Sequence, residues 1–94
     1  MLYFIHCEDK PDHLNVRIEN RTAHVDYIKT FHLLAAGPTL ADDEETMNGS
    51  VIIIDLPHAA ALQDFLTNDP YAKAGLFQNV TTRPWKKVIF QDIT

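Results

Sequence analysis

Two short stretches of this chain are apolar at every position, and they constrain the fold more than any other feature. Residues 51–54 read Val-Ile-Ile-Ile and residues 2–5 read Leu-Tyr-Phe-Ile. Such β-branched and aromatic residues favour strands, but a strand with one face in water alternates apolar and polar residues. Because neither stretch alternates, we expect both faces of the sheet that they form to be covered.

The first half of the chain predicts three strands and a helix. Apolar residues recur at helical spacing between about residues 17 and 32, after a first strand over residues 2–7 and a polar loop. A second strand over residues 33–38 stops at a Gly-Pro pair, and an acidic, solvated loop over residues 39–49 precedes the third strand, residues 50–56. The residues expected on the buried face of the helix are Ile18, Val25, Ile28 and Phe31.

Prolines mark the changes of structure in the second half. Pro57 opens the second main helix, where its missing N–H costs nothing. A shorter helical turn over residues 70–75 ends at a glycine, which suits a left-handed cap. The last strand lies within residues 79–93, where Pro84 indicates an edge strand or an irregularity.

The resulting order is strand, helix, strand, strand, helix, strand, within one domain over residues 1–94. This order predicts an α+β fold: a ferredoxin-like βαββαβ sandwich with both helices on one face of an antiparallel sheet. Two helices cover only one face, and the chain has no segment left for the other. The economical solution is a homodimer that packs sheet against sheet.

Charge and composition limit the classes of partner that we expect this protein to bind. The net charge is −5 and the basic residues form no stripe, so we do not expect nucleic acid to bind. No run approaches the ~20 apolar residues needed to cross a membrane. The single cysteine, Cys7, cannot form an internal disulfide, and a small domain without disulfides is typical of a reducing compartment. We therefore expect a cytoplasmic protein.

His24 is the first candidate for chemistry. It shares a helical stripe with Arg21, Ile28 and Phe31, so it leans toward the buried side of the first helix. A histidine on an apolar stripe is more often structural than catalytic. However, an unperturbed histidine titrates near pH 6.5, which suits proton transfer near neutrality.

Asp69 is the second candidate, and its position has two interpretations. Aspartate followed by proline is favoured at a helix start, so Asp69 is a natural N-cap before Pro70. A carboxylate that accepts a hydrogen bond from an N-terminal amide can also orient a nearby imidazole and favour its charged form. The residues themselves leave open a cap, half of an acid–base pair, or both.

The sequence gives little support for a metal site, a nucleophilic serine or a phosphate-binding loop. The five histidines include no His-x-x-x-His pair and there is one cysteine, so we expect no metal site. Ser50 follows Gly49 without a nucleophile elbow, and the three glycines are too far apart for a phosphate-binding loop. We therefore expect no cofactor.

Six segments together carry a family resemblance through nearly the whole chain. The chain resembles the YciI-like (YCII-related) family, within the muconolactone isomerase-like group of dimeric α/β barrels. These segments are LYFIHCEDK, RTAH, LLAAGP, GSVIIIDL, NDPYAKAGLF and RPWKKVIF. The resemblance implies a dimeric α/β barrel, in agreement with the strands that do not alternate.

The resemblance also implies a site. Members carry a histidine in Arg-x-x-His and an aspartate in Asp-Pro-Tyr, a proposed active-site pair that corresponds here to His24 and Asp69. A pocket between the helices and the sheet would then have Arg21, Ser50 and Tyr71 as substrate-binding residues. Trp85 would either add an apolar wall to this pocket or serve packing alone.

Two functions follow, from different classes. The first is a cofactor-independent isomerase or lyase that uses His24 and Asp69 to abstract a proton from a small cyclic or carbonyl compound. The second is a non-catalytic dimeric module that binds a small ligand or assists another protein, because a fold alone does not determine function. A haem-handling or oxygen-using monooxygenase with the same barrel is a third possibility, which a bound pigment would indicate.

Overall fold

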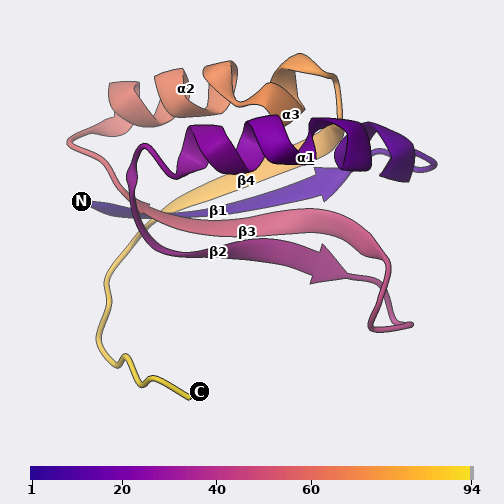
Figure 1. The fold of residues 1–94 in the computed structure, drawn as a ribbon. Coiled ribbons are helices and arrows are strands. Elements are labelled where there is room, and N and C mark those ends of the chain that lie inside the picture. Colours follow the sequence, from indigo (N-terminus) through magenta and orange to yellow (C-terminus); the bar gives the residue numbers. More distant parts are fainter. Residues whose placement is uncertain (94) are drawn as a thin grey trace.

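A computed structural model, which describes residues 1–93, contains a four-stranded antiparallel sheet with all its helices on one face (Figure 1). The strands follow the spatial order β2-β3-β1-β4. This arrangement confirms the predicted α+β, ferredoxin-like fold. No helix in the described residues is long and apolar enough to span a membrane. The elements are β1 (Leu2–Asp9), α1 (Leu14–Ile28), β2 (His32–Leu40), β3 (Met47–Asp55), α2 (Ala59–Asn68), α3 (Pro70–Lys73) and β4 (Phe77–Trp85).

Helix α1 begins and ends earlier than its apolar pattern predicted, and it buries a different stripe. Its buried residues are Arg17, His24 and Ile28, at spacings of seven and four. Ile18, expected on the buried face, is 58% exposed. Successive residues of a helix point about 100° apart, so the inward direction of Arg17 turns its neighbour Ile18 toward solvent. A charged residue has taken the inward place that the pattern assigned to an apolar one.

The predicted acidic loop is a shorter hairpin connection than expected. Strand β2 continues to Leu40 and β3 starts at Met47, which leaves residues 41–46 as the turn. In this turn the Asp43 carboxylate accepts hydrogen bonds from the Thr46 hydroxyl and from the backbone N–H groups of Thr46 and Glu45, which lowers the pKa of Asp43 to about 2. The acidic run is therefore an exposed hairpin tip, as expected of a solvated segment.

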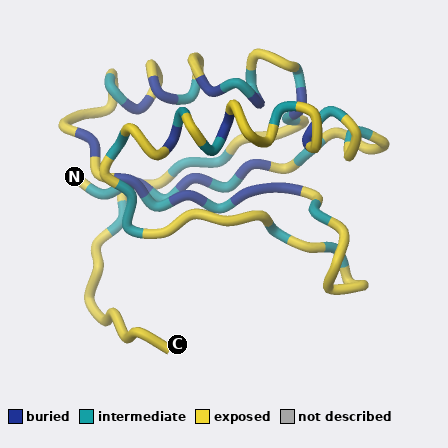
Figure 2. The backbone as a smooth tube through the Cα atoms, viewed as in Figure 1, coloured by how far each residue is buried: buried dark blue, intermediate teal, exposed yellow. Residues whose placement is uncertain are grey.

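The core lies between the helices and the sheet, where Figure 2 shows the buried stretches of β1 and β3 beneath the helices. Ile5, Ile52 and Ile54 are at most 1% exposed, and Phe65 of α2 is 2% exposed. Burying one such side chain stabilises the fold by roughly 1.5–3 kcal/mol. The aromatic rings of Tyr27, Phe31 and Phe65 lie within 5.5 Å of one another, centroid to centroid, and pack as one cluster.

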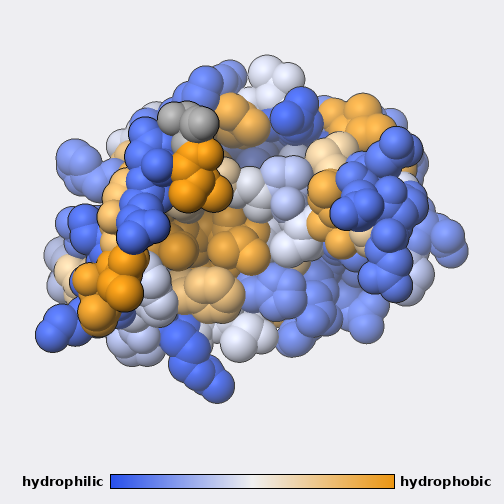
Figure 3. All heavy atoms as spheres, turned by 90° about the horizontal axis from the view of Figure 1, so that it is seen from below, coloured by the Kyte–Doolittle hydropathy of each residue, from blue (hydrophilic) through white to orange (hydrophobic). Residues whose placement is uncertain are grey.

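No helix lies over the opposite face of the sheet within residues 1–93 (Figure 1), and apolar atoms gather on the molecule when it is seen from this side (Figure 3). Alternate residues of β1 and β3 point to this face, and Phe4, Val51 and Ile53 are half-buried there. The last strand, predicted within residues 79–93, is β4, which starts two residues earlier at Phe77 and ends at Trp85; residues 86–93 form no regular structure. This C-terminal segment leaves the sheet on the side away from the helices (Figure 1) and carries exposed Val88, Ile89, Phe90 and Ile93.

Candidate active site

His24 and Asp69 lie in direct contact, although 45 residues separate them in the sequence. The Nδ1 atom of His24 is 2.8 Å from Oδ1 of Asp69, and the two side chains are only 7% and 2% exposed. Helix α1 supplies the histidine on its buried stripe, and Asp69 stands between α2 and α3. A bond of this kind fixes which ring nitrogen carries the proton, with Nδ1–H as donor to the carboxylate.

The same carboxylate also caps a helix. Oδ1 of Asp69 accepts a hydrogen bond from the backbone N–H of Tyr71 at 2.9 Å, and Pro70 occupies the first turn of α3. The backbone of Asp69 is extended, with φ −62° and ψ 126°, as an N-cap residue requires. Asp69 therefore acts as a cap and contacts the imidazole with one oxygen atom, so its two interpretations are compatible.

The second ring nitrogen of His24 has no hydrogen-bond partner within residues 1–93. In this part of the chain, no fully buried side-chain nitrogen or oxygen lacks a partner. Nε2 therefore keeps some contact with solvent, and His24 lines a pocket between α1 and the sheet. The ring is held on one side and reachable on the other, which is the geometry that proton transfer requires.

Tyr71 forms one wall beside the histidine. Its ring stacks on His24 with centroids 3.9 Å apart and planes 14° apart, and the residue is 1% exposed. Burial raises the pKa of Tyr71, although the charges of Arg17 and Arg21 partly oppose this shift. The phenol therefore stays neutral at physiological pH and presents a hydroxyl rather than a phenolate.

Arg17 is a site residue that the sequence analysis missed. Its guanidinium donates through Nε to Oδ2 of Asp9 at 2.6 Å and through Nη2 to Oδ1 of Asp9 and Oγ of Ser50, both at 2.9 Å. It also lies 4.7 Å from the centroid of the Tyr71 ring. Burial alone would lower the pKa of Arg17, but the hydrogen bonds and charge of Asp9 raise it above its ordinary value. The spacing of seven residues between Arg17 and His24 was the signal that could have identified it.

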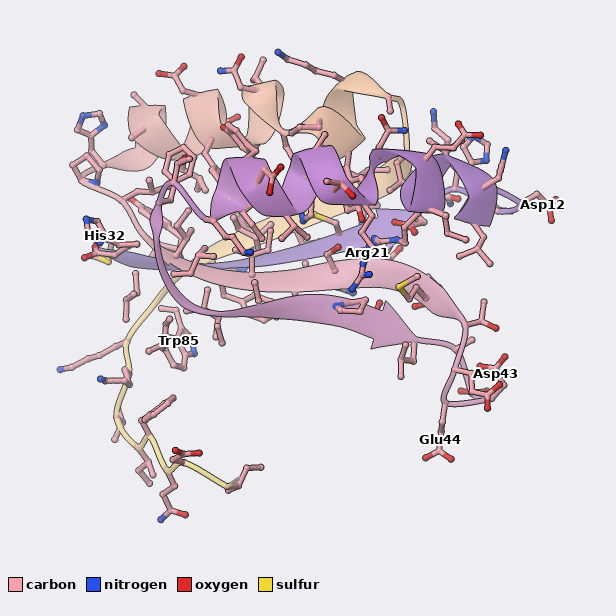
Figure 4. The ribbon with its side chains drawn as sticks, in the orientation of Figure 1. Asp12, Arg21, His32, Asp43, Glu44 and Trp85 are labelled. Atoms are coloured by element: carbon pink, nitrogen blue, oxygen red, sulfur yellow. The ribbon has the colours of Figure 1, made fainter. Side chains whose placement is uncertain are left out.

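The pocket itself has a volume of about 300 Å³. It brings together Arg21, Ser50 and Tyr71 with His24, while Trp85 lies outside it, on the face of the sheet away from the helices (Figure 4). The apolar wall is supplied instead by α1 and the strands. Its lining residues are Arg17, Arg21, His24, Val25, Ile28, Lys29, Leu33, Ala36, Gly37, Pro38, Met47, Ser50, Ile52 and Tyr71.

Cys7 lies beneath this site but is not suited to nucleophilic chemistry. It is 1% exposed, and burial together with the charge of Asp69 raises the pKa of its thiol to about 12. A thiol in this state is inert, since the thiolate is the reactive form. No group of three or more metal-ligating side chains occurs within residues 1–93.

Comparisons with known proteins agree on the family. Residues 1–86 match the YCII-related domain. Protein YciI of Escherichia coli is 36% identical over 97 residues, which cover 94% of this chain and 99% of the relative. An uncharacterised protein of Haemophilus influenzae is 34% identical over the same share of each chain.

A solved structure with a named activity is also similar. It is the 5-chloro-2-hydroxyhydroquinone dehydrochlorinase of Burkholderia phenoliruptrix in complex with 2,5-dihydroxybenzoquinone, with 36% identity and a TM-score of 0.85 over 92% of this chain and 94% of that one. An antibiotic biosynthesis monooxygenase, at 18% identity and a TM-score of 0.59 over 95% of this chain and 100% of that one, shares the fold alone. The motifs, the fold and these matches agree, and this chain belongs to the YCII-related family.

Proposed function

We propose that this protein is an enzyme that uses His24 as an acid–base group on a small cyclic compound bearing hydroxyl or carbonyl groups. The observation that carries the proposal is the orientation of the His24 ring. Asp69 holds Nδ1 at 2.8 Å, and Nε2 is the nitrogen left for a molecule in the pocket. The similar dehydrochlorinase supports this class of reaction, because it acts on a small hydroxylated ring.

The chemistry needs only the residues of the chain. Nε2 of His24 takes a proton from the substrate, and the electron pair of the broken bond forms a new double bond. In an elimination, the leaving group departs with the electron pair of its own bond, whereas in an isomerisation the proton returns to another atom. Asp69 stabilises the imidazolium that forms between these steps, and a positioned acid–base group of this kind contributes about 10²–10⁴-fold to the rate.

The experiment compares two histidine variants of one kind. His24→Gln removes the acid–base group, and His32→Gln removes an exposed histidine at the start of β2 (Figure 4), outside the pocket. The wild type is screened with chlorinated hydroxyhydroquinones and small lactones, for chloride release and for exchange of substrate protons with deuterium. We expect His24→Gln to lower the rate by about 10²–10⁴-fold and His32→Gln to leave it unchanged.

The opposite results are equally informative. Full activity in His24→Gln would show that another group moves the proton. Binding of these compounds by the wild type without turnover or proton exchange would favour the non-catalytic ligand-binding module instead. In that case His24 and Asp69 would form a structural hydrogen bond between α1 and α3.

We also propose that the protein is a homodimer joined through the open face of the sheet. The half-buried Phe4 and Ile53 lie on this face, and Phe90 of the nearby C-terminal segment is 62% exposed. Contiguous apolar surface of this kind marks an interaction site. Sedimentation should give twice the chain mass of 10.7 kDa, and Ile53→Lys should give the single mass while the surface control Thr22→Lys stays dimeric. A wild-type monomer at micromolar concentration would exclude the dimer.

Two further expectations are proposed with this function: residues 1–94 form a single domain, and the protein works in the cytoplasm. The residues of β1, β3, α1 and α2 share one core, which supports the single domain. Cys7 is buried within that core, where a partner thiol cannot reach it. We expect one cooperative unfolding transition, with the same midpoint with and without a reducing agent.

A further inference from the structure

The charges around the pocket differ in sign from those of the whole protein. The chain carries 13 acidic and 8 Lys and Arg residues, a net charge of −5. The charged residues that line the pocket are nevertheless Arg17, Arg21 and Lys29, and no aspartate or glutamate lines it. A concave site lined by one sign of charge concentrates ligands of the opposite sign. This pocket therefore suits an anion.

Ser50 is the polar group best placed to meet that anion. It is 3% exposed, lines the pocket, and accepts a hydrogen bond from Nη2 of Arg17 at 2.9 Å. Its own O–H donates no hydrogen bond within residues 1–93. A hydroxyl can both accept and donate, so this hydrogen remains available to a ligand. Because Ser50 already accepts from a cation, its O–H is polarised and becomes a stronger donor.

Asp9 holds Arg17 in the position from which it contacts Ser50. Its carboxylate holds Arg17 through two hydrogen bonds, and both side chains are at most 6% exposed. Asp9 itself does not line the pocket. The chain of contacts runs from the Asp9 carboxylate through the Arg17 guanidinium to the Ser50 hydroxyl, so a buried ion pair orients a neutral donor toward the cavity.

Arg21 provides the second positive group. It follows Arg17 by four residues on α1, so the two side chains lie on one side of the helix. The Arg21 side chain points from α1 toward the sheet (Figure 4), is exposed to solvent, and forms no ion pair within residues 1–93. Its charge is therefore available at the mouth of the pocket, where solvent and salt partly screen it.

We propose that the pocket binds its ligand as an oxyanion of the enolate or phenolate class, with the anionic oxygen held by the Ser50 hydroxyl and Arg21 and polarised by Arg17. The proposal rests on the proposed function, because proton removal by His24 leaves negative charge on such an oxygen. Donors placed where charge develops stabilise the transition state as well as the bound anion. The cavity of about 300 Å³ is at the small end for ligand sites, which favours a single ring.

The test measures binding rather than turnover, with two rings of similar size. One is 2,5-dihydroxybenzoquinone, whose acidic hydroxyls are ionised at neutral pH, and the other is the neutral 2,5-dimethyl-1,4-benzoquinone. Calorimetry should show at least about tenfold tighter binding of the ionised ring by the wild type. Ser50→Ala should weaken binding of that ring about tenfold, since a hydrogen bond to a charged group contributes at least ~1.4 kcal/mol. Binding of the neutral ring should not change.

Arg21→Gln should weaken binding of the ionised ring about threefold at low salt and less at high salt, because this side chain is exposed. The matched control is Arg83→Gln, an exposed arginine of β4 outside the pocket, which should change nothing. Equal affinity for the two rings, no loss in Ser50→Ala, or no binding of the ionised ring would each overturn the anion subsite.

His24→Gln separates this inference from the proposed function. If the variant loses turnover but still prefers the ionised ring, both stand. If it keeps turnover and the preference persists, the subsite stands and the role of His24 falls. If turnover is lost and the preference is absent even in the wild type, His24 stands and the subsite falls.

Discussion

The two halves of α1 cover different kinds of interior. The C-terminal half packs Tyr27, together with Phe31 just after the helix, against Phe65 of α2, with ring centroids 4.9–5.5 Å apart. The N-terminal half buries Arg17, and His24 lies about one turn beyond the middle of the helix. One interior is apolar and aromatic, while the other consists of hydrogen-bonded charges beside a pocket.

The difference indicates that separate groups of residues stabilise the fold and form the candidate site. Apolar contacts in the aromatic half are favourable wherever water is excluded. Charges in the polar half cost free energy to bury and are tolerated only when every donor and acceptor is satisfied. The fully buried atoms meet that condition, since none of the side-chain nitrogens or oxygens among them within residues 1–93 lacks a partner, whereas Nε2 of His24 has no partner and keeps contact with solvent. We therefore expect the aromatic half to hold the fold and the polar half to bind and react.

The largest expected effect is on the aromatic half. Phe65→Ala removes a ring that is 2% exposed and should lower the free energy of unfolding by about 3–5 kcal/mol. Urea denaturation measures this loss, and binding of 2,5-dihydroxybenzoquinone by the folded fraction should persist. Ile18→Ala, at a position 58% exposed, is the control and should change stability by less than about 0.5 kcal/mol. A small loss in Phe65→Ala would contradict the division between the halves.

In the polar half, Asp9→Asn should destabilise by about 3 kcal/mol, because Arg17 would remain buried without its counter-charge. Unlike Phe65→Ala, this change should also weaken binding of the ionised ring, since Arg17 orients Ser50. Asp55→Asn is the matched control: its pair with the N-terminus is more than half exposed and contributes about 0–1 kcal/mol. Equal losses in the two variants would show that burial of the Asp9 pair has no special cost.

The two roles of Asp69 can be separated by two substitutions. Asp69→Ala removes both the cap and the contact with His24, and should cost about 1–2 kcal/mol of stability. Asp69→Asn keeps a side-chain oxygen for the Tyr71 N–H, so its loss should stay below about 1 kcal/mol. Both variants should lower turnover, because neither has a carboxylate for the imidazolium. Normal turnover in Asp69→Asn would mean that Asp69 is a cap alone.

The smallest effect concerns pH. Burial raises the pKa of Cys7 from 9.0 to about 12, so the folded protein keeps a proton that the unfolded chain loses. The contribution of the protonated Cys7 thiol to the free energy of unfolding is fully present below pH 9 and declines as the pH rises toward 12. Between pH 9 and 10 the Cys7 contribution should fall by about 1 kcal/mol. Denaturation curves of wild type and Cys7→Ala should therefore converge over this interval, and parallel pH profiles would contradict the shift.

Much of the fold could be predicted because local patterns agreed with the tertiary structure. The apolar runs around Phe4 and Ile53 lie in the two central strands, β1 and β3. Pro70 after Asp69 marked the start of α3. The positions of His24 and Asp69 were also available from family motifs, although their contact spans 45 residues.

What could not be predicted depends on long-range partners. An arginine in a helix is normally solvated, and Arg17 is buried only because β1 supplies Asp9 and β3 supplies Ser50. That inward position in turn exposes Ile18, which the apolar pattern had placed inside. The sequence placed the last strand only somewhere within residues 79–93; β4 runs from Phe77 to Trp85, and the apolar side chains beyond it are exposed.

The sequence by itself therefore determined the order of strands and helices, the capping of α3 and the inward side of His24, since these follow from spacing and local geometry. Only the tertiary structure decided that Asp69 meets Nδ1 and leaves Nε2 to the pocket, and that a buried cation stands beside it. The physical reason is that the cost of burying a charge depends on its partners. Those partners come together only when the strands and helices have packed.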